Sequence, residues 1–205
     1  VNAGISGHMT FSTGTTQLAN SGSISLVTGI ASGGHGGDIV LQVSNGNSGA
    51  GGKVNIIGGS TTATDRTGGA VSITSGLSQG TTSGVVTVST ANAGTSGLSG
   101  AVLLSTGTTV KGNTGTITLQ SGIASSGRGG AVTVAVGSGT SGAGGDLTLT
   151  AGDTTDAAAG GSVTITAGKA ADAAARGGGV TIASGGSTSS STGTMTISTA
   201  NAESA

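Results

Sequence analysis

The sequence predicts an all-β chain, a single parallel β-solenoid of about 13 coils with a period of about 15 residues. Three observations predict it. A short motif recurs along the whole chain. Every copy opens with a triplet in which two apolar residues flank a residue that is usually Thr or Ser, and glycine-rich segments separate the triplets. The expected organisation is therefore one continuous β-solenoid over residues 1–205.

The composition excludes an ordinary aromatic-centred core. The 205 residues include 45 Gly and one Phe, and they contain no Pro, Cys, Trp or Tyr. The net charge is only -1, so charge repulsion does not keep the chain open, and we expect order or association in place of solvated disorder. Without cysteine, disulfides and thiolate metal sites cannot stabilise the chain.

The repeat is visible when the chain is written as successive units. SISLVTGIASGGHGG and TITLQSGIASSGRGG, for example, share their apolar positions and their glycines. Each unit contains 15 to 17 residues, and the last one is partial. The units begin at residues 8, 23, 38, 53, 70, 85, 101, 116, 131, 146, 162, 179 and 194.

Two columns of each unit are apolar. The second-position residues are Met9, Ile24, Ile39, Val54, Val71, Val86, Val102, Ile117, Val132, Leu147, Val163, Val180 and Met195. The fourth-position residues are Phe11, Leu26, Leu41, Ile56, Ile73, Val88, Leu104, Leu119, Val134, Leu149, Ile165, Ile182 and Ile197. A period of two in β-branched residues is typical of a short strand with one buried face.

The sameness of the units favours a winding in which each strand returns beside its predecessor, about 4.8 Å away. Burying two aliphatic side chains contributes about 3 to 6 kcal/mol, whereas ordering 15 residues costs about 15 kcal/mol or more. One coil is therefore not expected to fold without neighbours. Asp38 and Lys53 open successive units, so this winding predicts that they stack.

Glycine pairs precede many of the triplets. They predict either tight corners with a positive φ or a side-chain-free interior, where other residues would be excluded. The pairs are Gly36-Gly37, Gly51-Gly52, Gly68-Gly69, Gly129-Gly130, Gly144-Gly145, Gly160-Gly161 and Gly177-Gly178.

A longer period relates two super-repeats, residues 8–100 and 101–205. The first four units of each match with an offset of 93, which is 101 minus 8. A near-copied unit at 162–178 then lengthens the second super-repeat. Both chain ends fall inside repeats and no polar cap is visible, which predicts end-to-end self-association or continuation into further repeats.

Units of the form GGxVTIxxG resemble the β-solenoid stretches of giant secreted surface and adhesin-like proteins, including repeat proteins of algae such as diatoms. The resemblance covers the whole chain and rests on its VTV, VTI and LTL triplets and its glycine pairs. It implies a structural, filament-forming or surface-fibre segment of an extracellular or cell-surface assembly. The many Ser and Thr residues predict sites for O-linked glycans, and polysaccharide is a further expected partner. A non-catalytic carbohydrate-binding or adhesin surface is an alternative.

A second resemblance is to insect-type ice-binding β-solenoids, in which rows of Thr order water on a flat face. A threonine column, predicted to face outward, lies between the two apolar columns. Only two units, at Thr148 and Thr164, also carry Thr two residues later. The resemblance implies ice binding as an alternative function, although the paired threonines are few. The column consists of Thr10, Thr87, Thr118, Thr133, Thr148, Thr164, Thr181 and Thr196.

Catalytic, cofactor and metal sites are not predicted, and the chain is not expected to be an enzyme. The acidic residues are mostly separated, and the closest pair, Asp153 and Asp156, is typical of turns. His8 and His35 have no ligands at metal spacing. The scattered basic residues predict no nucleic-acid binding, and no apolar run is long enough for a membrane span.

Overall fold

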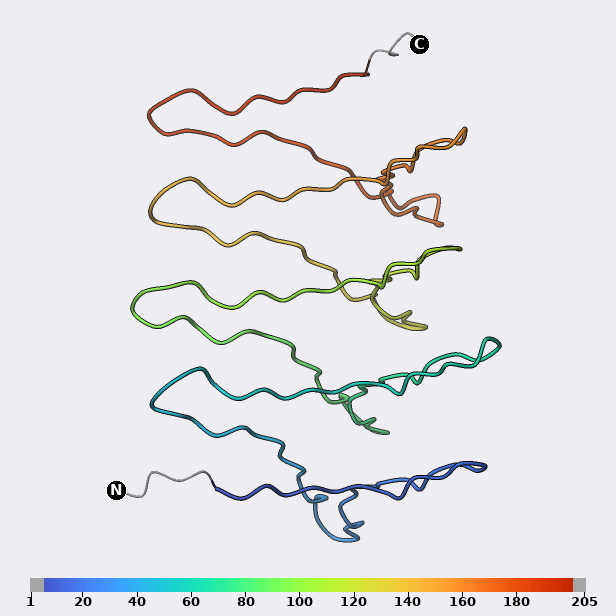
Figure 1. The fold of residues 1–205 in the computed structure, drawn as a ribbon. Coiled ribbons are helices and arrows are strands. Elements are labelled where there is room, and N and C mark those ends of the chain that lie inside the picture. The colour runs from blue at the N-terminus through green and yellow to red at the C-terminus, as the bar shows by residue number, and fades with distance from the viewer. Residues whose placement is uncertain (1–5, 201–205) are drawn as a thin grey trace. The chain divides into compact units, whose positions relative to one another are not determined.

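A computed structural model describes residues 6–200. These residues contain no α-helix and no β-strand, and Figure 1 draws them as a plain trace that repeatedly doubles back on itself. The prediction of an all-β parallel β-solenoid is therefore wrong for the part of the chain that the structure describes. The repeat itself persists, but it persists as local structure inside each unit.

Backbone hydrogen bonding explains the absence of a solenoid. In the described residues, backbone hydrogen bonds join residues of the same unit, such as Gly84 N–H to the Gly76 carbonyl at 3.0 Å. A parallel β-solenoid instead needs a ladder between equivalent residues of successive units. No residue among 6–200 is buried, so stacking provides no core either.

The apolar triplets form non-helical, extended segments. No described non-glycine residue has a positive φ, and the dark-red segment that ends near residue 200 illustrates the gently waving course of such a run (Figure 1). Alternating β-branched residues disfavour helix and favour this conformation. The second- to fourth-position residues take part in none of the backbone hydrogen bonds found within 6–200.

The rest of each unit forms a loop that closes on itself. In five units the N–H of the last glycine donates to the carbonyl of the seventh residue, which is also glycine. We define the loop clasp as the packing of the last glycine of a unit against residue six or seven of the same unit. In units 38–52 and 131–145 the last glycine lies against the valine at position six, without this hydrogen bond. The hydrogen bonds run from Gly69 to Gly59 (2.7 Å), Gly84 to Gly76 (3.0 Å), Gly161 to Gly152 (2.9 Å), Gly178 to Gly168 (2.9 Å) and Gly193 to Gly185 (2.9 Å).

Close approach requires glycine at the end of several units. A Cβ on Gly52 would lie 2.7 Å from Val43 Cγ1, and a Cβ on Gly145 would lie 2.9 Å from Val136 Cγ1. A Cβ on Gly69 would lie 2.9 Å from the Gly59 nitrogen. This close approach within one unit was not predicted, and it differs from a side-chain-free solenoid interior. At Gly37 and Gly130 the nearest atom would lie 3.6 Å away, which is an ordinary contact.

Positive φ is found at other glycines. Among the described residues it occurs at Gly49 (84°), Gly97 (119°), Gly112 (113°) and Gly142 (76°). Each of them lies three residues before the last glycine of its unit, inside the loop. The expectation of positive φ at the glycine pairs is therefore wrong, because the chain reverses inside the loop and not at the start of the next triplet.

The chain divides into two compact halves, Val1–Leu104 and Ser105–Ala205. The division falls inside the unit that begins at Ala101, the first residue of the predicted second super-repeat. Each half contains the same local elements: extended triplets, clasped loops and two glycines of positive φ.

Candidate functional site

The two apolar columns are the most extensive candidate site. Second-position exposure ranges from 50% at Val86 to 83% at Met9, and fourth-position exposure ranges from 63% at Val134 to 88% at Ile197. The residues lie two apart on one short segment in unit after unit. A single chain thus presents to water the side chains that globular proteins normally bury.

Loop residues add further exposed apolar groups. Leu18, Val110 and Ile123 lie in different loops and are essentially fully exposed, as is Ile30. Among the large apolar residues, the most protected are Val43 and Val136, with 44% and 47% exposure. Both are sixth-position residues held by a loop clasp, so the little protection that exists comes from the clasps.

All members of the predicted threonine column are exposed. So is nearly every other described residue, and exposure alone does not distinguish this column. Each of these threonines lies between the two apolar residues of its triplet, within the same extended segment. The structure brings no two members of the column together through a hydrogen bond within 6–200. An outward-facing, water-ordering role for the column stays a prediction.

The loop clasp was not predicted, although the sequence carries a signal for it. Every complete unit ends in glycine, and every sixth residue is small or β-branched. Five of these sixth-position residues are among the few described residues of intermediate exposure: Thr28, Gly58, Ser75, Ala151 and Ala167. The sixth-position residues are Thr13, Thr28, Val43, Gly58, Ser75, Thr90, Thr106, Ser121, Val136, Ala151, Ala167 and Ser184.

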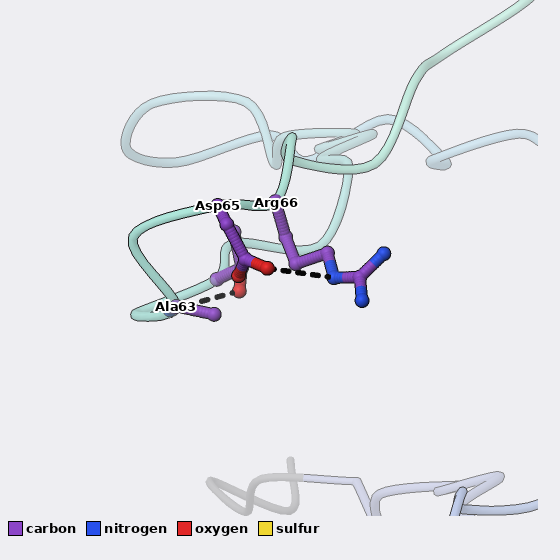
Figure 2. Close-up of polar contacts among 4 residues, drawn as sticks. Ala63, Asp65 and Arg66 are labelled. Atoms are coloured by element: carbon purple, nitrogen blue, oxygen red, sulfur yellow. Dashed lines mark hydrogen bonds and ion pairs between the residues drawn. The ribbon is translucent and has the colours of Figure 1, made fainter.

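Charged side chains form few contacts. Figure 2 shows the Asp65 carboxylate beside the guanidinium of Arg66, with Oδ2 and Nε 3.7 Å apart on two neighbouring, well exposed residues. Within 6–200 no ion pair joins Asp38 to Lys53, so the structure does not bring together the pair expected from stacked coils. His35 Nδ1 lies 2.8 Å from the carbonyl oxygen of the following Gly36, and this histidine is a surface residue.

The acidic loop residues serve local turns. The Ala174 N–H donates to Asp172 Oδ1 at 2.7 Å, and the Ala157 N–H donates to Asp156 Oδ1 at 2.8 Å. These bonds are typical of Asp in turns. The described part of the chain contains no pocket and no group of three or more potential metal ligands. The absence of catalytic, cofactor and metal sites, and of enzyme activity, stays a prediction.

The chain matches no protein-family model, and comparison with curated proteins and with solved structures found no match. Among residues 6–200 there is no helix whose length and apolar character would suit a membrane span.

Proposed function

We propose that this chain is a structural, self-associating segment of an extracellular fibre or surface layer. In this proposal the exposed apolar columns of one copy are covered by another copy, and ordered structure is completed by assembly. The observation that carries it is the absence of any buried residue among 6–200, although every triplet carries two large apolar side chains.

The hydrophobic effect favours removal of these side chains from water. Contiguous exposed apolar surface on a protein generally marks an interaction site or an aggregation site. The low net charge of -1 offers little repulsion against association. Regular spacing of the columns, in turn, favours repeated and registered contacts over irregular ones.

The backbone of the triplets supports the same proposal. Second- to fourth-position residues have no backbone hydrogen-bond partner within 6–200, so their N–H and C=O groups are free to pair with another chain. Unpaired extended segments are templates for association between chains. The clasped loops are different, because several of their backbone groups are already bonded within the unit.

An extracellular or cell-surface location is part of this proposal and rests on the resemblance to secreted surface repeats. Carbohydrate binding and O-glycosylation at Ser and Thr remain predictions. Ice binding was predicted for a flat, rigid solenoid face, and because residues 6–200 contain no strand, we do not propose it.

The test is the state of the purified full chain over a range of concentrations. Sedimentation velocity and negative-stain electron microscopy are expected to reveal elongated assemblies above a threshold concentration, with β-type amide infrared absorption increasing in parallel. A chain that remains monomeric at every concentration would contradict the proposal. Amorphous aggregates without regular width would contradict the registered contacts.

A further inference from the structure

The two halves of the chain carry conformationally equivalent units. Val43 and Val136, at an offset of 93, are the two most protected large apolar residues. Gly49 and Gly142, at the same offset, both have positive φ, with values of 84° and 76°. These two units therefore share local structure. Residues 8–69 and 101–161 correspond in sequence over four units of nearly equal length, although Gly112 has a positive φ and its equivalent is Ala19.

Charge distinguishes these otherwise similar segments. Lys53 opens the fourth unit of the first half, and Asp146 opens the equivalent unit of the second half, with the same offset of 93. Asp38 has Ala131 as its equivalent, and Lys111 has Leu18. The offset matches Arg128 with His35, which is counted as neutral at pH 7. Among the Lys, Arg, Asp and Glu residues of these four units, the offset thus pairs one basic residue with one acidic residue and pairs no like charges.

From this we infer that, in the self-association proposed above, residues 8–69 of one copy pair with residues 101–161 of a second copy. Lys53 of one chain then faces Asp146 of the next. Because each chain uses both halves, the contact continues from copy to copy and builds a staggered filament. The inference rests on the proposed function and adds the register and the partner.

Two other registers are less favourable. Pairing of identical residues sets Lys53 against Lys53 and Asp38 against Asp38, and like charges directly opposite each other destabilise paired segments. A shift of one unit pairs Lys53 with Asp38, but it loses alignment where the 17-residue unit 53–69 replaces the 15-residue units before it. The offset of 93 keeps all four triplets and the first three loops aligned, and the fourth loops differ by one residue.

Charge reversal in the full chain tests this register. At low ionic strength, Lys53→Asp or Asp146→Lys alone is expected to raise the threshold concentration for assembly by about three- to tenfold. The double variant Lys53→Asp/Asp146→Lys is expected to restore it. High salt is expected to reduce these differences, because exposed charges are screened. Asp38→Lys is the matched control and is expected to have little effect.

Mixing tests whether the pairing is between copies. An equimolar mixture of Lys53→Asp chains and Asp146→Lys chains has opposite charges at both types of junction, so assembly is expected to recover. Recovery in the double variant without recovery in the mixture would overturn the inference, because it indicates pairing within one chain. Equal sensitivity to Asp38→Lys and Asp146→Lys, or identical assembly of all variants, would also overturn the register while leaving self-association intact. Failure of the unaltered chain to assemble would instead contradict the proposed function.

Discussion

The triplets and the loops of this protein differ in whether their hydrogen bonds and packing contacts form within one unit. A loop closes within its own unit: its last glycine packs against residue six or seven, as in the 2.7 Å hydrogen bond from Gly69 to Gly59. A triplet has its apolar side chains half exposed or more, and its backbone makes no hydrogen bond within 6–200. The loop therefore forms its contacts within one unit, whereas the triplet needs a second segment to bury its apolar side chains and pair its backbone.

This difference assigns separate roles to the two regions. Short-range contacts within 8 to 10 residues can form in a single chain, because the entropy lost on closing a short loop is small. Contacts between triplets must order two long segments at once. The conformational entropy lost in doing so is offset only when many units share the interface. We therefore expect substitutions in triplets to affect assembly and substitutions in loops to affect local order.

The largest effect is expected from a charge in an apolar column. Val132→Asp places a carboxylate where assembly buries a methyl-rich side chain, and an unpaired buried charge costs several kcal/mol. We expect the threshold concentration to rise by about a hundredfold or more. Pelleting assays over a concentration series measure this.

Thr133→Asp is the control for this substitution, because residue 133 is adjacent but belongs to the polar position of the same triplet. An equal effect of both substitutions would show that net charge affects assembly and that burial of the apolar column does not. The distinction between the apolar and the polar positions of the triplet would then be wrong.

A smaller and more local effect is expected at the loop clasp. In Gly69→Ala the new Cβ lies 2.9 Å from the Gly59 nitrogen, so the clasp must open and the hydrogen bond from the Gly69 N–H is lost. Gly59→Ala is the matched control, since a Cβ there meets nothing within 4 Å. Amide exchange at residue 69 is expected to accelerate about tenfold in the first variant only. Equal exchange in both would contradict the clasp.

Substitution of Gly142, which has a positive φ, is expected to destabilise its loop to an intermediate degree. At 76°, Gly142→Ala places a Cβ in a conformation that costs about 1 to 2 kcal/mol. Gly144→Ala, in the same loop, has an open site and no positive φ. Chemical shifts of the Val136 methyl groups, which lie in the clasp of this unit, are expected to change in the first variant and to stay constant in the second. A change in Gly144→Ala without a change in Gly142→Ala would mean that the chain direction does not reverse at Gly142.

Much of the local structure follows from the sequence, and the long-range structure does not. The unit boundaries, the alternation at Val132 and Val134, and the need for glycine at Gly52 and Gly145 can be read from spacing and residue type. The same pattern is compatible with a coil that stacks on its neighbour in one chain and with a segment that associates with another chain, because both arrangements bury the triplet. Sequence periodicity defines which face is apolar, but it does not specify which neighbour covers that face. The β-solenoid prediction was wrong at this step.

The clasp was also missed for a physical reason. The glycine pairs predict corners or an interior between coils, whereas the constraint at Gly145 is the distance to Val136 Cγ1 within the same unit. The column of small or β-branched sixth residues points to this contact, since a longer side chain at position six would occupy the space of the returning backbone.

The smallest effect is expected at Asp172, whose carboxylate supports a single loop. Asp172→Ala removes the acceptor of the 2.7 Å bond from the Ala174 N–H, while the backbone bond from the Ala175 N–H to the Asp172 carbonyl remains possible. Amide exchange at Ala174 is expected to accelerate by about two- to threefold, with no change in the assembly threshold. Asp172→Asn keeps a side-chain oxygen and is expected to preserve the slower exchange. A change in assembly in either variant would mean that the loops take part in the contact between copies, and the division of roles between triplet and loop would then be wrong.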